Sequence, residues 1–72
     1  MTNEQFDLLL TLTSIRSADL IAALRSHFVD GLPQREAASL HEVHEGLLSR
    51  RVKAVREVEG TVIKLAKLYH KG

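Results

Sequence analysis

The stretch that most constrains the fold of this chain runs from Leu32 to Val55. Pro33 suits the first position of a helix, where its missing amide donor costs nothing. A short helix over Gln34–Leu40 can therefore follow, and its small residues would let a second helix cross closely. The residues expected on its inner face are Ala37, Ala38 and Leu40.

A second helix is expected from Glu45 to about Val58. Val43 would fill the inside of the turn before it, and His44 would cap the helix only weakly. Its apolar residues recur at intervals of four and three, which is helical spacing. These residues are Leu48, Val52 and Val55. The opposite face carries Ser49, Arg50, Lys53 and Arg56. A short helix, a tight turn and a second helix with a basic outer face are typical of a helix-turn-helix that enters a major groove.

The rest of the chain also reads as helical. Thr2 or Asn3 can cap a first helix that ends near Ser14, and Ser17 can cap a second helix that ends at Asp30-Gly31. Gly60 and Thr61 look like the end of one helix and the start of another. The prediction is an all-α bundle of about five helices, a single helix-turn-helix domain over residues 1–72, with a fifth helix over Val62–Tyr69.

Length and composition point to an oligomer. A chain of 72 residues buries only about 60% of its unfolded surface and is marginally stable alone. No Cys is present, so neither disulfides nor thiolate metal sites can supply stability. The terminal helices carry more apolar residues than a minimal core can bury, and we expect the surplus to form a dimer or larger homo-oligomer. The expected interface residues are Phe6, Leu9, Leu10, Leu65, Leu68 and Tyr69.

The net charge of +1 conceals an uneven distribution. Residues 1–48 hold three Lys/Arg and seven Asp/Glu, a net of −4, whereas residues 49–72 hold seven and two, a net of +5. The basic residues are densest at Arg50, Arg51, Lys53 and Arg56, with no acid among them. Such a cluster is typical of a nucleic-acid binder, although a solvated helix face would look the same.

The pair of histidines at the expected turn resembles a zinc-protease motif only superficially. His41 and His44 are three residues apart, whereas that motif needs a spacing of four on one helix. We expect no metal, no cofactor and no small-molecule ligand. Nothing orders the Ser, His and Asp residues into a triad and no phosphate-binding loop is present, so an enzyme is not expected.

The beginning of the chain, MTNEQFD, is acidic and polar and does not resemble a signal peptide. The longest apolar run, Leu8 to Leu10, is far too short to span a bilayer. We therefore expect a cytoplasmic protein without a membrane partner.

The run from Phe6 to Gly31, FDLLLTLTSIRSADLIAALRSHFVDG, resembles the start of the shared region in PapB-like regulators of bacterial adhesin (fimbrial) operons. That family has a similar Leu-rich opening, a Ser-Ile-X-Ser step and a helix that ends before Gly. Gly46 and Ser49 match its Gly and Ser in the recognition helix, and Leu65, Ala66 and Tyr69 match its Leu-Ala ending before an aromatic residue. The middle of the chain, from Val29 to Val55, is also similar to KorA/TrfB-like plasmid repressors.

The resemblance implies an oligomeric transcription regulator that binds double-stranded DNA through its helix-turn-helix. By motif position, the DNA contacts would be Gln34, Arg35, His44, Glu45, Ser49, Arg50 and Lys53. Arg51 and Arg56, at the flank, are interpreted as phosphate contacts or ion pairs. The chain departs from the pattern at the turn, where His41 replaces a buried Leu and Glu42 replaces a Gly that tolerates positive φ.

The sequence thus favours a sequence-specific transcription regulator of an adhesin operon or a plasmid gene. The alternative is a helical protein–protein interaction module that modulates another regulator. Its support is the acidic first half and the apolar last helix.

Overall fold

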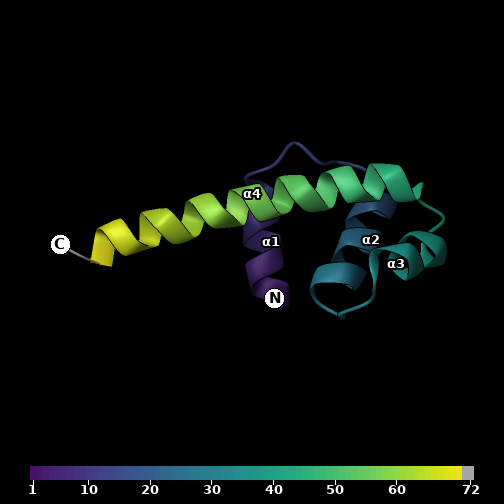
Figure 1. Ribbon diagram of the computed structural model, residues 1–72, viewed down its shortest axis with the longest axis horizontal. Helices are drawn as coiled ribbons and strands as arrows, with labels where there is room; N and C mark the ends of the chain where they lie inside the picture. The colour runs from purple at the N-terminus through teal and green to yellow at the C-terminus, as the bar shows by residue number, and fades with distance from the viewer. Residues whose placement is uncertain (71–72) are drawn as a thin grey trace.

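The computed structural model of the chain describes residues 1–70, and in that range it contains four α-helices and no strand. The helices are α1 (Asn3–Thr11), α2 (Ala18–Phe28), α3 (Gln34–Leu40) and α4 (Glu45–His70). α4 runs the length of the molecule, α1 crosses it near its middle, and α2 and α3 pack at its N-terminal end (Figure 1). The predicted all-α fold with a helix-turn-helix is confirmed, and α3, residues 41–44 and α4 form that motif.

Local signals place the first two helices where the sequence predicts them. The Thr2 hydroxyl accepts a hydrogen bond from the Gln5 amide at 3.1 Å, and the Gln5 side chain accepts one from the Thr2 amide at 2.8 Å, which completes a capping box. The Ser17 hydroxyl accepts from the Leu20 amide at 3.3 Å and caps α2. Beyond the end of α2, Gly31 adopts a φ of +80°, the left-handed conformation that glycine favours.

The predicted break at Gly60 and Thr61 is wrong, because α4 continues unbroken for 26 residues. Gly60 does not take a positive φ and so does not end the helix. The Thr61 hydroxyl donates to the Glu57 carbonyl at 3.2 Å, which is a contact of a residue inside a helix and not of a cap. At 1.5 Å per residue α4 is about 39 Å long, and most of its C-terminal half extends beyond the other helices (Figure 1).

Gly60→Ala should raise the free energy of unfolding by about 0.5–1 kcal/mol, because glycine inside a helix is less favourable than alanine by roughly that amount. A Cβ at position 60 would meet nothing within 4 Å, so no clash offsets the gain. Thermal unfolding followed by circular dichroism measures the change. Gly31→Ala is the matched control: its Cβ would also meet nothing, yet its positive φ predicts a loss of stability. A Gly60→Ala protein that melts below the wild type would contradict this account.

The core lies where α1, α2 and α3 meet the N-terminal two-thirds of α4. The largest fully buried side chains are Phe6, Leu24, Leu48 and Val55. Ala37 and Ala38 are buried where α3 packs against its neighbours, as predicted. Leu40 is 64% exposed, so its predicted place on the inner face is wrong. The inward side of this helix of about two turns runs through 37, 38 and the half-buried His41, which leaves position 40 outside.

An arginine of α2 holds α1 in place. The Arg25 guanidinium donates to Asp7 at 2.7 Å and to Asn3 at 2.8 Å, and lies over the Phe6 ring at 4.8 Å from its centroid. Because the Arg25–Asp7 ion pair is partly exposed, it contributes less than about 1 kcal/mol. Burial of the α1 side chains is therefore the larger stabilising contribution. No helix within residues 1–70 is both long and apolar enough to cross a membrane.

Candidate nucleic-acid interface

The turn between α3 and α4 is held in one conformation by backbone hydrogen bonds. The Val43 amide donates to the Ala38 carbonyl at 2.9 Å, and the Glu42 amide donates to the Ser39 carbonyl at 3.3 Å. Glu42 has a φ of 54°. This is a positive value, which the glycine usual at this position in the family pattern would tolerate. Glutamate adopts this left-handed conformation at a cost of about 1–2 kcal/mol. The contacts that hold the turn must offset that cost.

A hydrogen bond to α2 supports that turn. The Ser26 hydroxyl, 6% exposed, lies 2.8 Å from the His41 Nε2. His41 is half-buried. In the preceding connection, the His27 Nδ1–H donates to the Leu32 carbonyl at 2.7 Å. These two bonds join α2 to the residues just before and just after α3.

The start of α4 is capped by a histidine ring. The His44 Nδ1 accepts from the Gly46 amide at 3.1 Å, which satisfies one of the free amides of the first turn. A Cβ at Gly46 would lie 3.1 Å from the His44 ring, so glycine leaves room for this cap. Glu45 is exposed in the same turn, where its negative charge interacts favourably with the positive end of the helix dipole.

The outer face of α4 is basic. Leu48, Val52 and Val55 are buried and define the inward side of the helix. At about 100° per residue, Arg50 and Lys53 lie on the opposite side, with Ser49 beside them. All three side chains are exposed. The structure therefore brings these three predicted residues together on one surface.

Two other predicted residues lie at the two flanks of that surface. Arg51 is exposed, but a rotation of about 200° separates it from Lys53, so it projects from the opposite flank of α4. The Arg56 guanidinium lies 5.6 Å from the centroid of the Phe28 ring, a cation–π contact that holds it at the flank facing α2. Spacing alone could not reveal this contact, because Phe28 is far away in the sequence.

The predicted residues of α3 and of the turn lie at the N-terminal end of α4. Gln34 is half-buried and Arg35 is exposed at the start of α3, while His44 is exposed at the turn. In Figure 1, α3 lies at the same end of the molecule as the first turns of α4. A helix-turn-helix with an exposed, basic second helix can enter a major groove and contact phosphates on either side of it.

Comparisons with known proteins agree with this architecture. The sequence profile of a family described as "PapB: Adhesin biosynthesis transcription regulatory protein" matches residues 1–69. The chain belongs to this family. The PapB-like resemblance of the sequence is thus confirmed, whereas the similarity to KorA/TrfB-like repressors stays a prediction.

Two Escherichia coli proteins are similar to this PapB-family chain. One is "Regulatory protein FanB", 34% identical over 55 residues that cover 76% of the chain and 56% of FanB. The chain thus matches about half the length of that relative. The crystal structure of E. coli FocB is similar to the fold at a TM-score of 0.88, with 28% identity, over 96% of this chain and 78% of FocB.

The predicted oligomer residues of this PapB-family chain divide into three groups. Phe6 is fully buried and Leu9 is 7% exposed within one chain, so neither is available to a partner and their prediction as interface residues is corrected. Leu10 is half-buried. The other predicted residues, all in the projecting half of α4, are exposed: Leu65 at 47%, Leu68 at 66% and Tyr69 at 83%.

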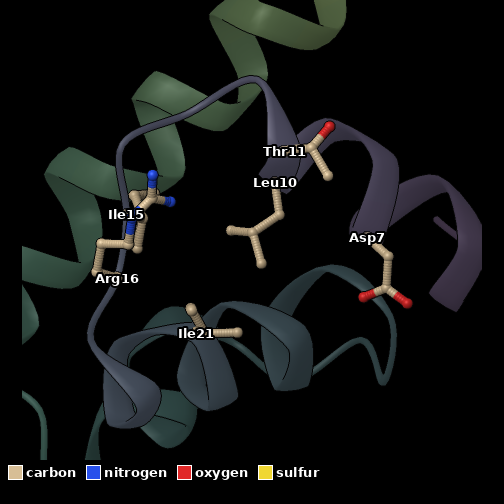
Figure 2. Close-up of a pocket in the computed structure, with 6 residues that line it drawn as sticks. All are labelled: Asp7, Leu10, Thr11, Ile15, Arg16 and Ile21. Carbon is tan, nitrogen blue, oxygen red and sulfur yellow. The ribbon is translucent and has the colours of Figure 1, made fainter.

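Two hollows of the surface are lined by both apolar and polar side chains. One, of about 240 Å³, is lined by Asp7, Leu10, Thr11, Ile15, Arg16 and Ile21. Leu10 and Ile21 approach each other across it, from α1 and α2 (Figure 2). The other, of about 260 Å³, lies between α1 and α4 and is lined by Gln5, Leu8, Leu9, Glu59, Val62 and Ile63.

The two histidines of the turn are engaged within the protein. The His41 Nε2 contacts Ser26, and the His44 Nδ1 accepts from Gly46. Within residues 1–70, no three His, Cys, Asp or Glu side chains come together as metal ligands.

Proposed function

We propose that this PapB-family chain binds double-stranded DNA through the outer face of the first half of α4. The observation that carries the proposal is the exposed group of Ser49, Arg50 and Lys53 on the second helix of a helix-turn-helix. Bound near the promoter of an adhesin operon in the cytoplasm, the protein would regulate transcription by occupancy, blocking or rearranging access of the polymerase. This role requires no cofactor or catalytic group.

The three side chains have different parts in this proposal. Arg50 can donate two hydrogen bonds to the edge of a guanine, and Lys53 can bind a guanine or a phosphate. Ser49 can donate to a phosphate oxygen. The surrounding residues would fix the docking of α4 on the phosphate backbone: Gln34, Arg35, His44, Arg51 and Arg56. Glu45 would repel phosphates. We therefore propose that it stabilises the start of α4 through the helix dipole and accepts hydrogen bonds from bases that carry donors.

We further propose that the chain self-associates through the projecting half of α4. Its accessible surface is 5216 Å² for a mass of 8.1 kDa, whereas a folded monomer of this mass exposes about 4,500 Å². The surplus of about 700 Å² is close to the roughly 800 Å² that each partner buries in a standard interface. The large apolar residues exposed on the projecting half of α4 would supply this interface area: Val62, Ile63, Leu65, Leu68 and Tyr69.

A mobility-shift titration with random-sequence and genomic duplexes at increasing salt tests DNA binding. If about four phosphates are neutralised, log K should fall with log salt at a slope of roughly −3.6. No binding at low salt would overturn the proposal and favour the alternative, a helical module that binds another regulator.

A further inference from the structure

The continuity of α4 aligns basic residues that a break would have separated. Counting by four, three, four, four and three residues along the helix gives one line of side chains along one flank of its exposed surface. We call this line the basic stripe; its members are Ser49, Lys53, Arg56, Gly60, Lys64 and Lys67. The stripe extends over about 27 Å, from the helix-turn-helix into the projecting half of α4.

The lysines at the far end of the stripe have no compensating charge within the described chain. No acid lies three or four residues before or after Lys64 or Lys67, and the one ion pair formed within residues 1–70 is Arg25–Asp7. Lys64 and Lys67 are three residues apart, a spacing at which like charges destabilise a helix. An anion outside the chain would relieve this repulsion.

The middle of the stripe gives an external backbone room to approach. Gly60 lies between Arg56 and Lys64, and a Cβ there would meet nothing within 4 Å. Packing within the chain therefore does not require glycine at this position, although glycine costs about 1 kcal/mol in a helix interior. Its effect is to lower the surface of α4 between two basic side chains.

We propose that the basic stripe continues the DNA-binding surface beyond the helix-turn-helix, with Lys64 and Lys67 binding phosphates that flank the groove entered by the first half of α4. The inference rests on the proposed DNA binding and extends it. Lys64 is eleven residues after Lys53, or about 17 Å along the helix, which exceeds the roughly 12 Å width of a major groove. The far lysines would therefore meet the backbone outside that groove.

This surface is compatible with self-association. Val62, Ala66 and Tyr69 follow one another by four and three residues on the side of α4 away from the stripe. A second copy could cover those side chains and Leu65 while the lysines face DNA, and Ile63 and Leu68, which border the stripe, would lie at the edge of that contact.

The test is a salt titration of the Lys64→Ala/Lys67→Ala protein against random-sequence duplexes of two lengths. On a long duplex the double variant should lose about ten- to a hundredfold in affinity, and its log–log slope should be shallower by about 1.8, since each lost phosphate contact removes about 0.9. On a duplex cut to the footprint of one helix-turn-helix, wild type and variant should bind alike. Lys64→Arg/Lys67→Arg should retain the wild-type slope.

Arg16→Ala is the control for the loss of an exposed positive charge elsewhere, because it removes one such charge from the connection between α1 and α2. Sedimentation of every variant checks that self-association is unchanged. An unchanged slope on the long duplex, in a protein whose Arg50→Ala/Lys53→Ala variant does lose binding, would overturn the stripe and leave the proposed function standing. A wild type that binds no duplex would overturn both.

Discussion

Arg50→Ala/Lys53→Ala should lose duplex DNA binding by a hundredfold or more while the protein keeps its wild-type melting temperature. Both side chains are exposed on the side of α4 opposite Leu48 and Val55, so their removal takes nothing from the core. In DNA, each good bidentate base contact is worth about 1–3 kcal/mol, and each phosphate contact adds to the salt dependence. Fluorescence anisotropy of a labelled duplex gives the affinity, and circular dichroism gives the melting temperature.

The neighbouring arginine provides a matched control for this prediction. Arg51→Ala removes the same chemical group as Arg50→Ala, one residue further along, from a position rotated by about 100° from Arg50 and about 160° from Lys53. Arg50→Ala should therefore have the larger effect on affinity. A double variant that still binds with the wild-type salt slope would rule out this placement of the interface.

Leu68→Glu should convert a dimer or larger species into a monomer. Leu68 is 66% exposed in one chain, so a glutamate there does not disturb the fold of the monomer. In an interface the same change buries a charge without a partner, which costs several kcal/mol. Sedimentation at micromolar concentration should show the shift. DNA binding should weaken as well, because symmetric copies of the recognition helix bind two half-sites together.

Leu40→Glu is the control for the sedimentation experiment. Leu40 is exposed to a similar extent, 64%, but lies on α3, away from the projecting half of α4. It should sediment like the wild type. A wild type that sediments as a clean monomer, both free and on DNA, would contradict the self-association proposal.

The signals that predicted the fold correctly are local. Thr2 with Gln5, Ser17 and Gly31 each act on the few residues beside them, so their caps and turn could be predicted from sequence. Gly60 and Thr61 carry a similar local signal, yet α4 continues through them. A glycine ends a helix only where its φ becomes positive, and at position 60 it does not.

The candidate interface depends more on contacts between helices. Helical spacing was enough to place Arg50 and Lys53 on the outer face of α4. It could not show that Ser26 supports the turn through His41, because fifteen residues separate them. Nor could composition show that Phe6 is buried within one chain, which depends on how α1 crosses α4.

The central claim is that the first half of α4 lies against DNA, and one cysteine can test it directly. The chain contains no Cys, so Ser49→Cys gives a unique attachment point for an iron–EDTA group that cleaves nearby DNA. Glu4→Cys, exposed on α1, is the matched control. On a duplex selected from a random pool by the wild type, cleavage from position 49 should cluster within a few base pairs and cleavage from position 4 should be weak or absent. Bound protein that cleaves from position 4 as strongly as from position 49, or not at all from position 49, would contradict the account.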